Sequence, residues 1–198
     1  MWVLSRTRSG KPVELRLIDL VVDLMEAILD DGCSRMSRPD RQSGIRTRLA
    51  HANEAALVAL VLRKAFLQYE SLYTAKAFAV TTPTPGEILK RWKEGPVWVA
   101  VQGGRLVGTI AAAAKRRALY IRSMAIVPSA RRQGIGKMLL EEVENFAKAA
   151  GFQRMLLSTT PFLYDAIRLY ERFGFEKTPA GPHDLAGTPL FTMEKALK

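Results

Sequence analysis

A short loop rich in glycine and cations most constrains what this chain can fold into. Its residues are Arg131, Arg132, Gln133, Gly134, Ile135, Gly136 and Lys137. An apolar run at 120–127 precedes the loop and an amphipathic run at 138–150 follows it, which predicts a strand, a turn and then a helix. The first N–H groups of a helix have no partner within it, and the helix dipole places positive charge behind them. We therefore expect a phosphate-binding site at this loop.

The spacing of the two glycines narrows the kind of phosphate site. A Walker loop would need Gly-x-x-x-x-Gly-Lys followed by Ser or Thr, which this segment does not contain. A dinucleotide fingerprint would need Gly-x-Gly-x-x-Gly after the first strand of a parallel unit. Here the spacing differs, and the preceding strand belongs to a predicted antiparallel meander. Both of these nucleotide-binding classes are therefore excluded.

The remaining periodicity predicts an α+β domain with one mixed central sheet. Apolar runs predict strands at 45–50, 97–101, 106–114, 119–127, 154–159, 175–177 and 189–194. Helical spacing predicts helices at 54–69, 87–93, 137–150 and 164–173. In chain order these elements give an antiparallel meander followed by β-α-β-α-β, with helices flanking the sheet.

Residues 1–44 are expected to form an N-terminal extension to the domain at 45–198. Between about 15 and 31, apolar residues recur at helical spacing, and acidic residues fall on the opposite face. This pattern predicts an amphipathic helix, and the Ser-, Arg- and Pro-rich stretch at 34–44 reads as a linker. Two interpretations stay open. The helix packs on its own domain, or it docks on a partner or a second subunit, which would give a homodimer.

The composition limits the partners that we expect. The net charge is +11, from 30 Lys and Arg against 19 Asp and Glu, but no long basic block or nucleic-acid-binding motif occurs. No apolar run approaches the roughly 20 residues that span a bilayer. We therefore expect no nucleic-acid partner and no membrane segment.

The cysteine and histidine content bears on the compartment and on metal binding. The single cysteine, Cys33, allows no internal disulfide, which fits a reducing compartment, so we expect a cytoplasmic protein. With one cysteine and two histidines we expect no metal site.

Two segments together resemble the GNAT superfamily of N-acetyltransferases. The first runs from Met124-Ala125-Ile126-Val127-Pro128 through the loop at 131–137 to Leu139-Leu140, and the second is Ala166–Phe175, AIRLYERFGF. The resemblance covers roughly residues 45–195. It implies that acetyl-CoA is the co-substrate and that the acetyl group passes directly to a primary amine of a small molecule or peptide, without a metal.

The resemblance also implies roles for individual residues. A bulge would splay the strand before the loop, so that the backbone of Met124, Ala125 and Ile126 binds the pantetheine arm. The backbone N–H groups of residues 132–137 would cradle the pyrophosphate, and the side chains of Arg131, Arg132 and Lys137 would add positive charge. Tyr170 would act as the general acid that protonates the departing thiolate.

The sequence departs from the family pattern at two places. Leu163 stands where relatives often place a cofactor-binding asparagine, and the strands at 119–127 and 154–159 carry no carboxylate to act as a base. A water held by Tyr120, Ser123 or Ser158 could relay the proton instead. These departures leave a second reading open, a non-catalytic domain that binds acyl-CoA and has a regulatory role.

The acceptor is expected to enter between residues 54–93 and the loop at 179–189. Glu70, Glu87 and Glu94 are candidate anchors for a cationic acceptor there. The net charge instead favours an anionic or neutral acceptor.

Overall fold

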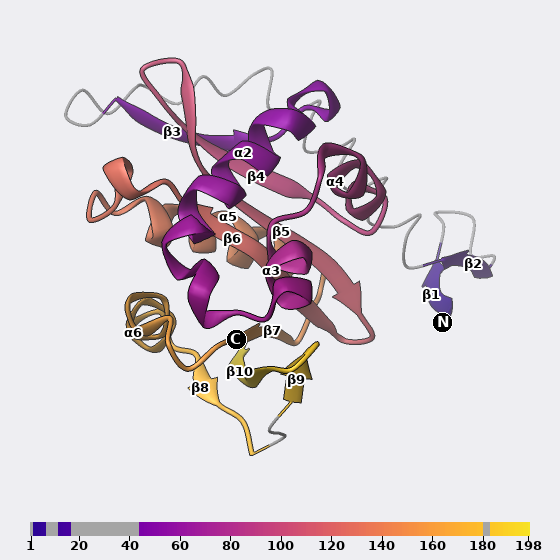
Figure 1. Ribbon diagram of the computed structural model, residues 1–198. Coiled ribbons are helices and arrows are strands. Elements are labelled where there is room, and N and C mark those ends of the chain that lie inside the picture. Colours follow the sequence, from indigo (N-terminus) through magenta and orange to yellow (C-terminus); the bar gives the residue numbers. More distant parts are fainter. Residues whose placement is uncertain (1, 7–11, 17–43, 180–182) are drawn as a thin grey trace. The chain divides into compact units, whose positions relative to one another are not determined.

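A computed structural model describes residues 2–6, 12–16, 44–179 and 183–198 (Figure 1). The chain divides into two compact units, residues 1–42 and 43–198. In the first unit, β1 (Trp2–Arg6) pairs antiparallel with β2 (Pro12–Arg16). Leu15 and Arg16, at the start of the helix predicted at about 15–31, belong to β2. The remainder of that helix and Cys33 lie outside the described residues.

The second unit is built on one twisted, mixed sheet. Its strands are β3 (Ile45–Leu49), β4 (Val97–Gln102), β5 (Arg105–Lys115), β6 (Ala118–Ile126), β7 (Arg154–Thr159), β8 (Glu176–Lys177), β9 (His183–Leu185) and β10 (Thr188–Ala196). The spatial order is β3-β4-β5-β6-β7-β10-β8, and β9 pairs with β10. All neighbours are antiparallel except β6 and β7, which are parallel. This arrangement confirms the predicted fold class, in which a meander is followed by β-α-β-α-β.

Helices cover both faces of the sheet (Figure 1). They are α2 (Ala55–Phe66), α3 (Ala75–Thr81), α4 (Pro85–Trp92), α5 (Ile135–Ala149) and α6 (Tyr164–Arg172). The helices α2, α3 and α4 lie on one face, while α5 lies on the other. The first five residues of β4, Val97 to Val101, are buried, because helices cover this strand on both sides.

The core on the α5 face follows directly from the amphipathic pattern of that helix. Leu139, Leu140 and Val143 are fully buried, and Phe146 packs edge-on against Trp98 of β4 at 5.5 Å between ring centroids. Charged residues fall on the solvent face, where Glu144 pairs with Lys148 one turn later. The helix is thereby fixed against the sheet, with its first turn at the glycine loop.

Two elements depart from the sequence prediction for local reasons. The helix predicted at 54–69 ends at Phe66, and a 3-10 segment, η2 (Leu67–Leu72), continues the chain. The short helix α3 was not predicted. It has seven residues, of which only Ala77 and Phe78 are buried, so it offers almost no periodicity. Its start depends on Thr74, whose Oγ1 accepts a hydrogen bond from the Ala77 N–H at 3.2 Å.

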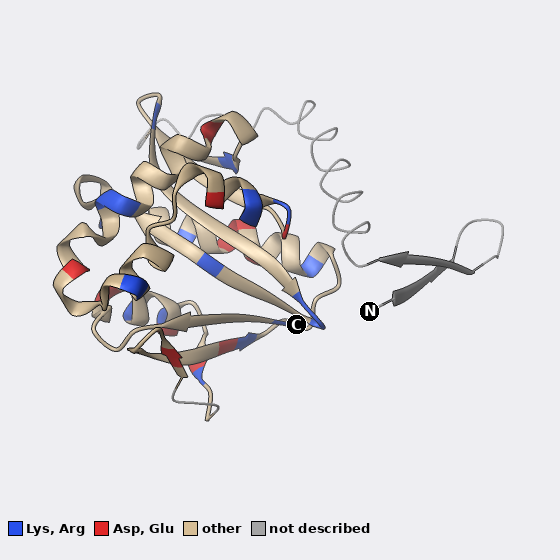
Figure 2. Ribbon diagram, turned by 45° about the vertical axis from the view of Figure 1, so that its right-hand side comes forward, with Lys and Arg blue, Asp and Glu red and all other residues tan. Residues whose placement is uncertain are grey.

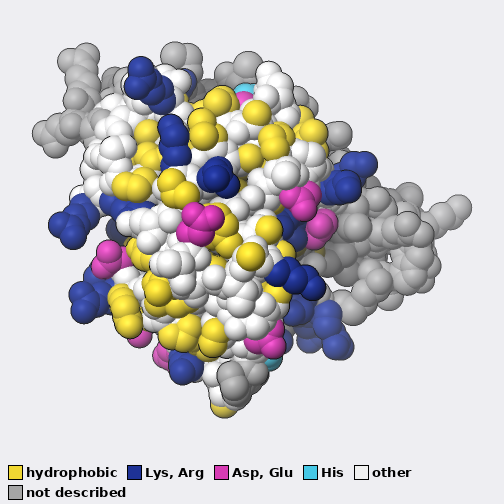
Figure 3. Space-filling model, in the orientation of Figure 1, with side chains coloured by type: hydrophobic (Ala, Val, Ile, Leu, Met, Phe, Trp, Pro, Cys, Tyr) yellow, Lys and Arg dark blue, Asp and Glu magenta, His cyan; other side chains and the backbone are white. Residues whose placement is uncertain are grey.

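Charged side chains are spread over the second unit. Figure 2 shows Lys and Arg on many separate elements, and Figure 3 shows them interspersed with apolar side chains on one face. Within the described residues, no helix is both long enough and apolar enough to span a membrane.

We predict that Gly95→Ala destabilises the domain by about 3 kcal/mol, because overpacked sites do not relax freely. A β-carbon at Gly95 would overlap the backbone carbonyl oxygen of Ala112 on β5. The matched control is Gly86→Ala in the first turn of α4, where the added carbon meets nothing within 4 Å and should stabilise by about 0.5 kcal/mol. Urea unfolding of both variants measures the difference, and equal effects would contradict the prediction.

Candidate functional site

The sheet opens where β6 and β7 part. Their parallel pairing covers only four residues of β6, Ala118 to Ile121, which face Arg154 to Leu157. Beyond Ile121, no β7 backbone is paired with β6, so the N–H and C=O groups on that side of β6 are free of sheet bonds. Free main-chain groups at an inner strand can bind an extended ligand as an added strand would.

A β-bulge sets the direction of the free part of β6. The register with β5 shifts by one between the pair Ala111–Arg122 and the pair Thr109–Ala125. Two residues of β6, Ser123 and Met124, therefore stand against the single Ile110 of β5. Ser123 has φ of 53°, in the left-handed region that costs free energy for a residue other than glycine. The bulge bends β6 away from β7 while β6 stays paired to β5.

The glycine loop lies directly after this strand. A 3-10 turn, η3 (Pro128–Ala130), leads from β6 into the loop, and Gly134 precedes the first residue of α5 with φ of 79°. Gly136 packs closely on the next element, since a β-carbon there would lie 2.6 Å from Cδ2 of Leu169 on α6. The free N–H groups of α5 therefore face the opening, and α6 lies against its first turn.

The three cations of the loop have different surroundings. The Arg131 guanidinium donates to the carbonyl of Ala65 on α2 at 3.0 Å and to that of Ile126 at 3.4 Å. Arg132 is exposed, and Lys137 is exposed with Glu141 at 3.3 Å on the next turn. Arg131 thus ties the loop to α2 and β6, while Arg132 and Lys137 present their charge to solvent.

A cleft of about 1140 Å³ occupies the opening. Of the eleven residues predicted for the site, ten line it, namely Met124, Ala125, Ile126, Arg131, Arg132, Gly134, Ile135, Gly136, Lys137 and Tyr170. The side chain of Gln133 is not among those that line the cleft. The Gln133 side chain is exposed, and its amide oxygen accepts a hydrogen bond from the side chain of Gln102 at 2.8 Å.

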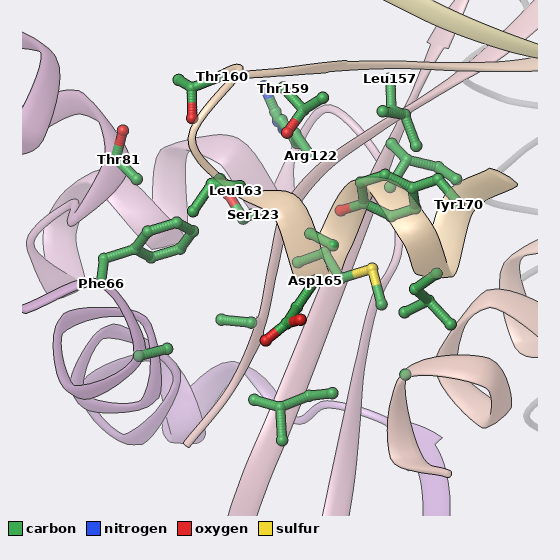
Figure 4. A pocket seen from close by; sticks show the side chains of 18 of the residues that line it. Phe66, Thr81, Arg122, Ser123, Leu157, Thr159, Thr160, Leu163, Asp165 and Tyr170 are labelled. Atoms are coloured by element: carbon green, nitrogen blue, oxygen red, sulfur yellow. The ribbon is translucent and has the colours of Figure 1, made fainter. Parts of the chain in front are cut away.

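Tyr170 comes from α6 and is the one buried residue of that helix. Figure 4 shows its hydroxyl pointing into the pocket, on the side where Ser123 and Asp165 lie. Its ring packs edge-on against Phe175 at 6.0 Å. Burial raises the pKa of the Tyr170 hydroxyl well above its usual range, and the nearby Tyr73 adds to that rise. The hydroxyl therefore keeps its proton at neutral pH.

The other wall of the cleft comes from α2, η2, α3, α4 and β10. Aromatic rings of Phe66, Tyr69 and Tyr73 line it, together with Arg91 from α4 and Arg122 from β6. The sequence reasoning missed both arginines. The signal for Arg122 was a charge within the apolar run at 119–127, whereas Arg91 carried no local signal.

Several groups considered from the sequence can now be placed. Tyr120, Ser123, Ser158 and Leu163 all line the cleft. None of the three glutamates considered as acceptor anchors does so. Glu87 caps α4 by accepting from the Thr84 N–H at 2.8 Å, Glu94 pairs with Arg122 at 2.7 Å, and Glu70 is exposed.

Comparison with known proteins gives three findings. Residues 63–175 match the family model described as Acetyltransferase (GNAT) family. Mouse N-acetyltransferase family 8 member 3 is 34% identical over 87 residues, which cover 41% of this chain and 38% of that protein. The match thus spans well under half the length of that curated relative. Escherichia coli K12 YjgM, described as an uncharacterized N-acetyltransferase, is 30% identical over 141 residues, or 68% of this chain and 83% of that protein.

A solved structure supports the fold assignment. The PaiA N-acetyltransferase from Thermoplasma acidophilum, in complex with coenzyme A, has a TM-score of 0.62 at 20% identity. The similarity covers 77% of this chain and 98% of that one.

The raised pKa of Tyr170 predicts a pH dependence of stability. The unfolded chain releases this proton near pH 10, and the folded chain retains it, so the folded state binds more protons above that pH. Stability should therefore fall as the pH rises above about 10, by about 1.4 kcal/mol per pH unit for this group. Tyr170→Phe should show a correspondingly shallower loss. Urea unfolding between pH 8 and 11 measures both slopes, and parallel slopes would refute the burial argument.

Proposed function

Because the chain belongs to the Acetyltransferase (GNAT) family, we propose that it transfers the acetyl group of acetyl-CoA to a primary amine of a small molecule or peptide. The observation that carries this proposal is the shared cleft. It joins the unpaired edge of β6, the first turn of α5 and the Tyr170 hydroxyl in one space.

The donor would bind mainly to main-chain atoms. The backbone of Met124 to Ile126 would hold the pantetheine arm in a strand-like pairing, because β7 leaves that side of β6 free. The N–H groups of residues 132–137 would hold the pyrophosphate at the positive end of the α5 dipole. Arg132 and Lys137 would add side-chain charge, and Arg131 would keep the loop in place.

The transfer itself would need one attack and two proton movements. The neutral amine forms a C–N bond to the thioester carbonyl carbon, and a backbone N–H of β6 stabilises the oxyanion. When the C–S bond breaks, Tyr170 donates its proton to the sulfur. A water held by Tyr120, Ser123 or Ser158 takes the proton that the amine loses. The protonated state of buried Tyr170 suits a donor that acts late, as the thiolate forms.

One observation favours a second candidate function. Neither β6 nor β7 supplies a carboxylate to the cleft, so no strand carboxylate is placed to act as a base. A non-catalytic acyl-CoA-binding domain would fit that fact. Acetyl-CoA binding in a calorimeter, without thiol release against a broad amine panel, would support this second reading.

We predict that Tyr170→Phe lowers kcat by about a hundredfold, because it removes the proton donor for the leaving thiolate. The KM for acetyl-CoA should change little. Tyr164→Phe is the matched control, since Tyr164 lies on the same helix with 69% of its surface exposed. Free-thiol release with an accepted amine measures both variants. Full kcat in Tyr170→Phe across the pH range would exclude the acid role.

The loop predicts a separate effect on donor affinity. Arg132→Gln should weaken acetyl-CoA binding about fivefold, because it removes one exposed charge near the phosphates. Arg116→Gln is a close control, since Arg116 is also an exposed arginine with positive φ, in the β5–β6 turn. Calorimetric titration at fixed ionic strength compares the two. Equal affinities would show that the Arg132 charge does not contribute to phosphate binding.

A further inference from the structure

We propose that the acceptor carries a carboxylate close to its amine, and that Arg91 binds this carboxylate beside the β6 bulge. The proposal rests on the proposed acetyl transfer and names its acceptor class, an amino acid with an apolar or aromatic side chain.

Arg91 is a half-buried cation without an acidic partner. Its guanidinium donates to the carbonyl of Val80 at 2.9 Å and approaches Oγ of Ser123 at 3.4 Å. Among the ion pairs of the described residues, Arg48 and Arg122 each have a carboxylate at 2.7 Å, and Arg91 has none within 4 Å. A guanidinium has five N–H donors in a planar fork, so donors remain for a ligand carboxylate.

Arg122 lies beside Arg91, and its own charge is paired with a carboxylate. Its Nη1 pairs with Glu94 at 2.7 Å, its Nη2 donates to the Arg91 carbonyl at 3.1 Å, and its buried Nε has no partner. Arg122 thereby fixes the backbone of Arg91 at the end of α4. Burial, and then the charge of Arg122, lower the pKa of Arg91, and the carboxylates of Glu87 and Glu94 oppose this shift less strongly.

The charges around the cleft agree with an anionic group on the acceptor. Asp165, in the first turn of α6, is the one acidic residue among the described residues that line the cleft. On the acceptor side Arg91 and Arg122 line the cleft, and the nearby carboxylate of Glu94 is taken up by Arg122, which leaves the charge of Arg91 uncompensated by an ion pair. A second ammonium group on the acceptor would be repelled there, which disfavours diamines and polyamines.

Arg91 lies close to the part of β6 that would bind the acetyl donor. Its contact, Ser123, precedes Met124, the first residue of the free β6 backbone that would bind the donor. Figure 4 places Ser123 in the same pocket as the Tyr170 hydroxyl and the Phe66 ring. An amine separated from its carboxylate by one or a few carbons would thus lie next to the bulge. The Phe66, Tyr69 and Tyr73 rings offer an apolar wall for its side chain.

Acceptor pairs that differ only in the carboxylate test this proposal. L-phenylalanine is compared with 2-phenylethylamine, and L-leucine with 3-methylbutylamine, by free-thiol release with acetyl-CoA. We expect kcat/KM to favour the amino acid at least about tenfold, as for a hydrogen-bonded charge pair. In Arg91→Gln this ratio should fall to near one. In Arg91→Lys the ratio should be intermediate, because lysine keeps the positive charge but lacks the planar guanidinium that can donate two parallel hydrogen bonds. Lys90→Gln, an exposed neighbour on α4, should keep the ratio of the unmodified protein.

A binding measurement separates this proposal from the transfer reaction. N-acetyl-L-phenylalanine and N-acetyl-2-phenylethylamine, neither of which has a titrating amine, are titrated calorimetrically into the CoA-bound protein. If N-acetyl-L-phenylalanine binds more tightly than N-acetyl-2-phenylethylamine, and Arg91→Gln removes the difference, the carboxylate subsite is supported. This holds even if no acceptor releases thiol, and that result would contradict the transfer reaction alone. Equal binding and equal use of both pair members by the unmodified protein overturn the subsite, while thiol release would still support the transfer. The subsite would also be overturned if Arg91→Gln and Arg91→Lys lowered kcat/KM equally for the amino acid and for the amine without a carboxylate.

Discussion

The interruption of backbone pairing between β6 and β7 is the constraint around which the rest of the second unit is arranged. An inner strand normally has partners on both sides, and unpaired N–H and C=O groups in a closed interior are costly. Here β6 keeps β5 on one side and loses β7 after four residues. The free edge has to face water or a ligand. The bulge at Ser123 and Met124 fixes the direction of this edge, so the edge is accessible and has a defined conformation.

The elements around this opening place positive charge at two separate positions. The first is the start of α5, where the helix dipole and the exposed Arg132 and Lys137 combine. The second is the end of α4, where Arg91 lies over the bulge and Arg122 holds it there. Buried Tyr170 lies in the same cleft, with its hydroxyl protonated at neutral pH. The cleft thus combines two cationic positions with a fully buried tyrosine hydroxyl.

The sequence predicted those parts of the domain whose signals are local. The glycine loop, the meander and α5 each have a continuous pattern of periodicity and turn residues, and the structure confirms them. The short α3 and β9 have too few residues for a period to show. The pairing of Arg91 with Ser123 joins positions 32 residues apart, and Arg131 reaches α2 across 66 residues. Such contacts depend on the tertiary arrangement, so reading along the chain could not reveal them.

The two hydrogen bonds of Arg131 have a mechanical consequence. They join the loop to the carbonyl of Ala65, the residue before Phe66, and to the carbonyl of Ile126 at the end of β6. A shift of the loop on taking up phosphates would therefore be passed to α2 and to the Phe66 ring beside it. The two halves of the cleft are connected through one side chain, and occupancy of one half can alter the shape of the other.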